Sequence, residues 1–396
     1  MPEPLETVKD RVEAEVDRLA DVLLDVSHRI HEHPELAFAE HHAHDLLTAV
    51  LEEQGLAVER SAYGLDTAFA ARAGTEGPTV VVCCEYDALP GIGHACGHNV
   101  IAAAGLGAGL AAAAVAADAG GRLLILGTPG EEGGGGKQLM IDAGALDGVA
   151  AAVMVHPADA DLRTMDTLAI QRVTVTYAGK AAHAAASPEA GRNALDAAVL
   201  GYVNVAALRQ HITPAERVHG IFLEAGDAAN IVPSRAVAQW YVRSPTAAGL
   251  AALRERVTAC LRAGAEAAGC TLELDWYEPA YDELVGLDAF DALYAANAER
   301  VGRTPLTPGE GGAARVVGST DMGNVSQHVP AIHPMIKVAP AGVSIHTEAF
   351  VGHARGPEGD AAVLDGAKAL ATTVADLWLR PDVLAGIGDD FRQRRG

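Results

Sequence analysis

Three short apolar segments, each followed by polar and glycine-rich residues, constrain the fold of this chain most strongly. They are residues 79–84 (TVVVCC), 123–126 (LLIL) and 149–155 (VAAAVMV). The first is continuous and rich in β-branched residues, which is typical of a strand covered on both faces of a sheet. Helical segments at about 100–117 and 137–143 separate the three strands. This alternation predicts an α/β fold with three layers, in which a sheet lies between helices.

A second pattern interrupts the first between about residues 164 and 280. Its apolar and polar residues alternate, which is typical of an antiparallel sheet with one exposed face. Strands are predicted at 168–177, 218–223, 236–243 and 271–276, with helices at 193–209 and 247–268. A chain of 396 residues exceeds the size of one compact core, so two domains are expected. We predict a larger α/β domain, residues 1–163 and 281–396, interrupted by a smaller α+β domain, residues 164–280. We also expect residues 168–177 to form an exposed edge strand, with backbone groups available for pairing.

The composition excludes two classes of partner and indicates a compartment. The net charge is −23, from 29 basic and 52 acidic residues, and aromatic residues make up only 4%. A field of this sign repels phosphate backbones and anionic membranes, so we expect neither a nucleic acid nor a membrane as partner.

The five cysteines are odd in number, and two of them are adjacent in an apolar strand, which argues against a disulfide framework. Together with an N-terminus that lacks a signal-peptide core, this predicts a cytoplasmic protein.

Candidate metal ligands follow each of the three predicted strands. Cys96 and His98 follow the first in GHACGHN, Glu131 and Glu132 follow the second, and His156 follows the third. Thiolate, imidazole and carboxylate groups are the usual ligands of zinc. Because open α/β sheets bind their ligands at the carboxyl ends of the strands, these side chains are expected to converge in one crevice. The sequence therefore predicts a metal site there, with one ion or a pair.

Another candidate ligand, His346, lies in a loop after a strand predicted at 331–338. His353 follows shortly afterwards and is an alternative ligand that the sequence leaves open.

The adjacent glutamates suit two different tasks. One can bind a metal while the other faces a water molecule whose pKa the metal has lowered. A base is still needed to carry the water's proton to the leaving amine. A pair of glutamates at the start of a helix, favoured by the helix dipole, is the alternative explanation of Glu131 and Glu132.

A series of motifs resembles peptidase family M20, a family of zinc metallohydrolases. In chain order they are CEYDALPGIGHACGHN (84–99), GTPGEEGGGGK (127–137), VMVHP (153–157), GKAAHAAASPEAGRNALDA (179–197), NIVPS (230–234), STDMGNVS (319–326) and SIHTEAF (344–350). The motifs span nearly the whole chain. The chain is most similar to the amidohydrolase branch, which includes hippurate, indole-acetyl-amino-acid and p-aminobenzoyl-glutamate hydrolases.

The resemblance implies a catalytic larger domain and an inserted domain that serves as a lid and forms a homodimer. It implies two divalent metal ions, most commonly zinc, with manganese or cobalt as alternatives. Their ligands would be Cys96, His98, Glu132, His156 and His346. Glu131 would be the general acid and base.

The resemblance also implies roles for three residues of the inserted domain. His183 would reach the site of a neighbouring copy of the chain and stabilise the oxyanion. Asn230 and Arg243 would contact the substrate, with Arg243 a candidate clamp for a carboxylate.

The implied reaction cleaves the amide bond of an N-acyl or aminobenzoyl amino acid and releases a carboxylic acid and an amino acid. A metallo-dipeptidase acting on short dipeptides is the alternative. A non-catalytic metal-binding protein is a third possibility, which the intact Glu131 and the complete ligand set argue against. The chain departs from the family pattern at Asn99, where many relatives carry an acidic residue, and at HTEA (346–349), where His-Thr-Pro-Glu is more common.

Overall fold

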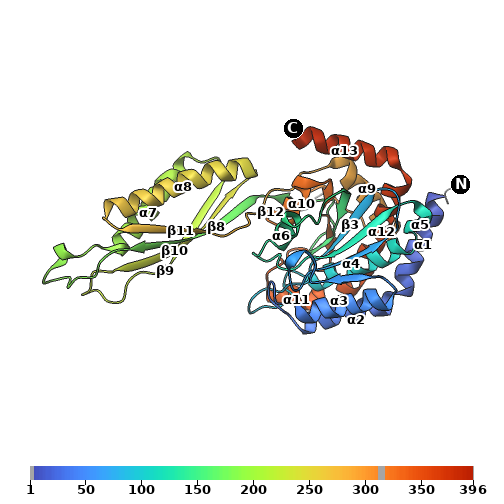
Figure 1. Ribbon diagram of the computed structural model, residues 1–396, viewed down its shortest axis with the longest axis horizontal. Coiled ribbons are helices and arrows are strands. Elements are labelled where there is room, and N and C mark those ends of the chain that lie inside the picture. Colours follow the sequence, from blue (N-terminus) through green and yellow to red (C-terminus); the bar gives the residue numbers. More distant parts are fainter. Residues whose placement is uncertain (1–3, 311–316, 396) are drawn as a thin grey trace. The chain divides into compact units, whose positions relative to one another are not determined.

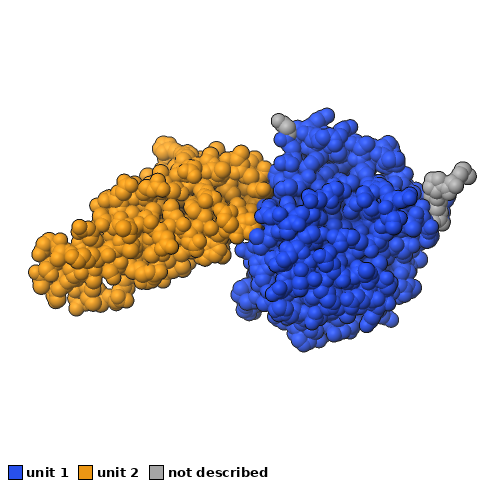
Figure 2. All heavy atoms as spheres, in the orientation of Figure 1, with its two compact units in different colours: residues 1–166, 284–396 blue, residues 167–283 orange. Residues whose placement is uncertain are grey.

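The computed structural model describes residues 4–310 and 317–395, and the chain forms two compact units (Figure 2). Unit 1 comprises Met1–Asp166 and Leu284–Gly396, and unit 2 comprises Thr167–Glu283. The sequence alone places these boundaries at residues 164 and 280. Among the helices within the described ranges, none combines the length and the apolar character that a membrane span requires.

A six-stranded sheet forms the middle layer of unit 1 (Figure 1). Its order is β1 (Val58–Arg60), β2 (Phe69–Ala73), β4 (Arg122–Gly127), β3 (Thr79–Cys84), β5 (Val149–Val153) and β13 (Ala331–Ile332). β3 pairs in parallel with both β4 and β5, and β5 pairs in parallel with β13. β1 and β2 add an antiparallel pair beside β4. The three strands that precede the candidate ligands therefore end at the same edge of the sheet.

Helices cover both faces of this sheet because its buried strands are apolar on both sides. Val80 and Val82 of β3 pack in one core, whereas Val81 and Cys83 pack in another. The first face carries α1 (Leu5–Arg18), α2 (Ala20–Glu32), α3 (His41–Glu53), α4 (His98–Ala113) and α12 (Pro357–Leu379). The opposite face carries α6 (Gly136–Asp142) and α10 (Met322–His328). The predicted three-layer α/β fold is thus confirmed.

The remaining elements of unit 1 are shorter or peripheral. They are η1 (Ala62–Gly64), α5 (Ala116–Ala119), α9 (Asp288–Arg300), α11 (Glu348–Ala354) and α13 (Pro381–Arg395). The sequence suggests a frayed tail over residues 389–396; of these, Gly396 lies outside the described residues, and residues 389–395 belong to α13, where Phe391 is buried. The strand predicted at 331–338 is divided: β13 pairs with β5, while β14 (Met335–Lys337) pairs with β6 (His156–Ala158).

Unit 2 is a four-stranded antiparallel sheet with two helices, as the predicted α+β insertion requires. The sheet order is β11 (Thr271–Trp276), β8 (Ala169–Ala178), β10 (Arg235–Ser244) and β9 (Arg217–Glu224). The helices α7 (Ala194–Leu208) and α8 (Ala247–Ala267) share a core with the strands. One expectation is wrong: β8 is not an edge strand, because it pairs with both β10 and β11. Alternation of polar and apolar residues indicates that one face of the sheet is exposed. It does not indicate whether a strand has a neighbour on each side.

Candidate active site

A glycine turn after β3 presents the first two candidate ligands. Gly97, between Cys96 and His98, has a φ of 78° and precedes α4. Glycine adopts this left-handed conformation without strain. A Cβ atom at this position would lie 2.9 Å from the side chain of Pro157. Gly97 therefore allows the turn to pack against the segment after β5 that carries His156.

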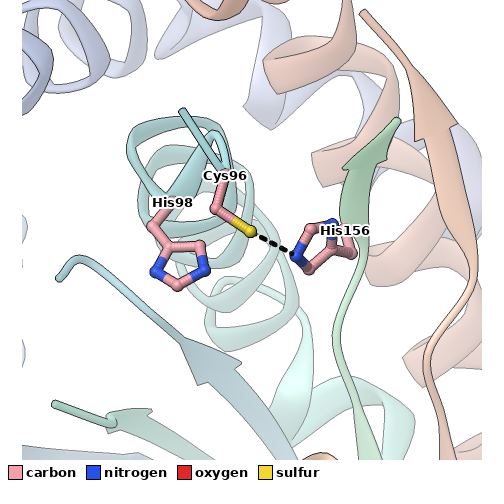
Figure 3. Close-up of side chains that lie close together, drawn as sticks. All are labelled: Cys96, His98 and His156. Carbon is pink, nitrogen blue, oxygen red and sulfur yellow. Dashed lines mark hydrogen bonds between the residues drawn. The ribbon is translucent and has the colours of Figure 1, made fainter. Parts of the chain in front are cut away.

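Cys96, His98 and His156 converge at the carboxyl edge of the sheet (Figure 3). The Sγ atom of Cys96 lies 3.4 Å from Nε2 of His156, and the rings of His98 and His156 meet edge to face with centroids 5.9 Å apart. One ligand atom from each of the three residues lies within 4.8 Å of the others, and all three side chains are buried. Burial, assisted by His333 and His98, lowers the pKa of His156 to about 3. His156 is therefore neutral, as a metal ligand must be.

A second group combines Cys96 with Glu132 and His346, again within 4.8 Å. Oε1 of Glu132 lies 3.5 Å from Nε2 of His346. His346 has a φ of 65°, a conformation that costs a non-glycine residue about 1–3 kcal/mol and is common at functional sites. Its backbone N–H donates to the carbonyl oxygen of Ala95 at 2.8 Å, which holds the loop beside Cys96. His353 lies on α11, outside every metal-capable group found among the described residues.

Unpartnered buried atoms provide a test of whether these residues fit a metal. Nε2 of His98 and Oε1 of Glu132 are buried without a hydrogen-bond partner in the part of the chain that the structure describes. Two ligand atoms bound at about 2.1 Å to one tetrahedral ion lie roughly 3.4 Å apart. The measured separations of 3.4 Å (Cys96–His156) and 3.5 Å (Glu132–His346) match this spacing. The donor set therefore fits divalent metal binding.

Asp87 orients two of the candidate ligands. Its Oδ1 lies 3.0 Å from Nδ1 of His98, and its Oδ2 accepts the backbone N–H of Glu132 at 2.8 Å. Burial raises the pKa of the Asp87 carboxyl, but the hydrogen bond and charge of His98 more than offset it, so this pKa is lowered. A carboxylate on Nδ1 directs the other ring nitrogen of a histidine toward a metal.

Glu131 lies next to the two metal-capable groups that contain Cys96, and it forms a third such group with His98 and Glu85. Its Oε2 is 3.9 Å from Nε2 of His98. Burial, together with the carboxylates of Glu85 and Glu132, raises the pKa of Glu131 well above the usual range of a glutamate. A carboxyl with a raised pKa can both accept and donate a proton near neutral pH, as a general acid and base must.

The sequence alone assigned no role to three buried residues at the site, Lys137, Glu85 and His333. The Nζ atom of Lys137 lies 2.5 Å from Oε1 of Glu85 and 2.6 Å from Oδ1 of Asp321. The ring of His333 lies beside that of His156, with centroids 5.2 Å apart. Glu85 could have been singled out as a charged residue that directly follows a buried strand. For His333, within a segment read as a strand, the sequence offers no signal.

Unit 2 brings together two of its three predicted site residues, His183 and Asn230. The N–H of Ala184 donates to the carbonyl oxygen of Asn230 at 3.0 Å, and His183 forms a β-bridge with Ile231. Both His183 and Asn230 are exposed. Nδ1 of His183 accepts the backbone N–H groups of Ala185 and Ala186, each at 3.2 Å. In the neutral ring the proton is therefore on Nε2, which can donate a hydrogen bond.

Arg243 lies at the other end of β10. Arg235, at the start of this strand, pairs with Ala178, and Arg243 pairs with Ile170. The eight residue-to-residue steps from Arg235 to Arg243 span about 26 Å. Arg243 is half-buried, and this burial lowers its pKa. Within one chain, Arg243 is therefore far from the loops that carry His183 and Asn230.

Comparison with known proteins finds relatives that match most of this chain. The model of Peptidase family M20/M25/M40 matches residues 82–376. The chain is 39% identical to the Xaa-Arg dipeptidase of Mus musculus, over 98% of this chain and 93% of that protein. It is 28% identical to one of the two p-aminobenzoyl-glutamate hydrolase polypeptides of Escherichia coli (strain K12), over 99% of this chain and 96% of that protein.

Solved structures share the fold. A dinuclear metal binding peptidase of the M20 family from Bacillus subtilis has a TM-score of 0.69 at 21% identity, covering 90% of this chain and 98% of that one. The aminobenzoyl-glutamate utilization protein of Klebsiella pneumoniae has a TM-score of 0.71 at 22% identity, covering 91% and 98%. The matched segment contains all of the candidate ligands and Glu131. This chain therefore belongs to Peptidase family M20/M25/M40 and is a metal-dependent hydrolase of amide bonds.

Proposed function

We propose that this enzyme cleaves the amide bond of an N-acyl or aminobenzoyl amino acid and releases a carboxylic acid and an amino acid. The observation that carries the proposal is the position of Glu131, a buried carboxyl 3.9 Å from Nε2 of His98 and beside two metal-capable groups. A small amide substrate is the only partner that this chemistry requires. We place the enzyme in the cytoplasm, where reducing conditions keep its five cysteines free.

The proposed metal centre holds two divalent ions. Zinc is the first choice because of the cysteine ligand, and manganese or cobalt are alternatives. Cys96, His98 and His156 would hold one ion, and the group of Cys96, Glu132 and His346 would hold the other. When bound, such ions polarise the substrate carbonyl and lower the pKa of water.

Glu131 moves the proton in this proposal. Its raised pKa suits a group that takes a proton from the attacking water and then gives it to the departing amine. Nε2–H of His183 would donate a hydrogen bond to the carbonyl oxygen as negative charge develops on it. The backbone donors from Ala185 and Ala186 hold the ring in the tautomer that this task needs.

The positions of the proposed substrate-contacting residues favour an arrangement in which two chains contribute to each site. Asn230 lies beside His183, in the loop that precedes β10, whereas Arg243 lies near the far end of this strand, about 26 Å from its first residue, Arg235. A small amide substrate cannot span that distance, so one chain cannot supply all three side chains to one substrate molecule. We therefore propose that His183 and Asn230 act together in the site of a second copy of the chain, and that Arg243 binds the carboxylate of a different substrate molecule.

An apolar surface on unit 2 supports the homodimer. The edge strand β9 exposes Ile221, Phe222 and Leu223, with 61%, 40% and 55% of their surfaces accessible. Helix α7 exposes Val199, Leu200 and Val203. The rings of Tyr202 on α7 and Phe222 on β9 lie 5.9 Å apart and join the two exposed sets. Unpaired edge strands and apolar patches of this kind favour pairing with another chain.

A mixed dimer tests the shared site. The variants His183→Ala and Glu131→Gln, each as a homodimer, should be nearly inactive. A dimer with one chain of each, isolated after co-expression with two different tags, should recover about half of the wild-type activity, because one of its two sites receives both intact residues. A mixed dimer as inactive as its parents would show that His183 does not act across chains.

A second candidate function is the hydrolysis of dipeptides with a basic second residue. It is favoured by the higher identity to an Xaa-Arg dipeptidase, 39% against 28% for the aminobenzoyl-glutamate hydrolase. The net charge of −23 also attracts cationic substrates.

A substrate panel separates the two functions. It compares N-acetyl, N-benzoyl and p-aminobenzoyl amino acids with dipeptides that end in arginine, lysine or a neutral residue. We expect the highest kcat/KM on the acyl or aminobenzoyl amino acids. A preference of tenfold or more for dipeptides ending in arginine or lysine would instead establish the second candidate.

A further inference from the structure

Glu85 is a buried carboxylate that the proposed metal centre does not yet use. It directly follows β3 and has no exposed surface. Its Oε1 accepts a hydrogen bond from Nζ of Lys137 at 2.5 Å. Its Oε2 is buried without a hydrogen-bond partner among the described residues. An unsatisfied carboxylate oxygen in a protein interior is costly, so its persistence needs an explanation.

The unpartnered oxygen faces another unpartnered atom. Oε2 of Glu85 lies 3.6 Å from Nε2 of His98, which is also buried without a partner in the described part of the chain. Nδ1 of His98 is turned toward Asp87 at 3.0 Å, so Nε2 is the nitrogen left for the centre. Ligand atoms of Glu85, His98 and Glu131 lie within 4.8 Å of one another.

The separation of 3.6 Å between Oε2 of Glu85 and Nε2 of His98 indicates whether the two atoms share a direct hydrogen bond, a water molecule or a metal ion. It exceeds the 2.7–3.2 Å typical of a direct hydrogen bond. Two groups that share one water, each at about 2.8 Å, would lie roughly 4.5 Å apart. Two ligands of one tetrahedral zinc lie roughly 3.4 Å apart. A shared metal ion fits the distance best.

We propose that Glu85 is a sixth protein ligand of the metal centre, binding through Oε2 the same ion as His98. This inference rests on the proposed metal centre and extends its ligand set. Lys137 is a positioning residue, because its ammonium group holds Oε1 and so turns Oε2 toward His98. Lys137 also directly follows the glycine run after Glu131 and Glu132, so one side chain ties the Glu131 loop to the end of β3.

The test measures zinc binding to the full-length protein after metal removal, with a competing chelator that reports free zinc. Wild-type protein is expected to hold two zinc ions per chain. Glu85→Gln, which is similar in size but carries no charge, should retain one tightly bound ion and bind the other at least 100-fold more weakly. Glu85→Asp, which keeps the charge but withdraws the oxygen by about one methylene, should lie between the two. If Glu85→Gln does not fold, judged by circular dichroism, Glu85→Asp carries the test.

Asp321→Asn is the matched control. It removes the same charge from the other carboxylate on Lys137, whose Oδ1 lies 2.6 Å from Nζ, and should change zinc affinity by less than about threefold. Unchanged zinc binding in both Glu85 variants would overturn the assignment of Glu85. So would an equal loss in Asp321→Asn, because the charge around Lys137 would then explain it. If wild-type protein bound no metal, the metal centre itself would fail, which is a distinguishable result.

Discussion

Replacing Glu131 with glutamine is expected to lower kcat by roughly 10²- to 10⁴-fold while the metal content stays at the wild-type level. Glutamine preserves the size of the side chain but cannot accept the proton of the attacking water. Burial and the neighbouring carboxylates raise the pKa of the Glu131 carboxyl. The amide of glutamine has no carboxyl group that could take up or release this proton. The measurement is kcat on the best substrate, with metal analysis of the same sample.

The adjacent residue provides the control for this variant. Glu132→Gln makes the same chemical change one position later, but Glu132 is a proposed metal ligand, grouped with Cys96 and His346 and with its Oε1 3.5 Å from Nε2 of His346. It should lose metal together with activity, whereas Glu131→Gln should lose activity alone. Near-normal turnover of metal-loaded Glu131→Gln would show that another group carries the proton.

Replacing Cys96 with alanine should remove at least one metal ion and lower activity by at least 10³-fold, because its sulfur belongs to two of the metal-capable groups. In the metal-free protein, burial raises the pKa of the Cys96 thiol well above normal, and a bound metal would displace this proton. The fold should survive, since alanine leaves only a small cavity. Metal content, activity and the melting temperature in a chelator are measured together.

Cys83→Ala is the matched control for this experiment. Cys83 is also buried, but it lies within β3 and packs in the core between the sheet and helices α6 and α10. Its removal should reduce stability slightly and leave metal content and activity unchanged. A fully active, metal-replete Cys96→Ala variant would reduce Cys96 to a packed core thiol.

Local patterns made much of the fold predictable. Residues 79–84 and 271–276 form strands with the predicted bounds, because a run of β-branched residues or a strict alternation depends only on neighbours in the chain. The helical spacing of apolar residues over 5–30 predicts one helix, but the structure has two, α1 and α2, interrupted at Leu19. Both helices bury their apolar residues in the same core. The spacing of apolar residues in the sequence therefore does not indicate where the first helix ends and the second begins.

Strand partners were less predictable. The sequence identified β8 but not its position inside the sheet, because an edge is defined by which other strands pair with it. The exposed apolar residues of β9 mark the edge only when β10 is known to cover its other side.

The sequence by itself determined the family and the candidate ligands, because spaced motifs such as GHACGHN carry their chemistry in residue type and order. Only the tertiary structure decided how these residues combine. It placed Cys96 in two metal-capable groups, and it set His183 apart from Arg243 along β10. It also turned the buried Glu85 toward His98. The physical reason is that Lys137, which holds Glu85, is 52 residues away in the chain, and such a contact follows from packing.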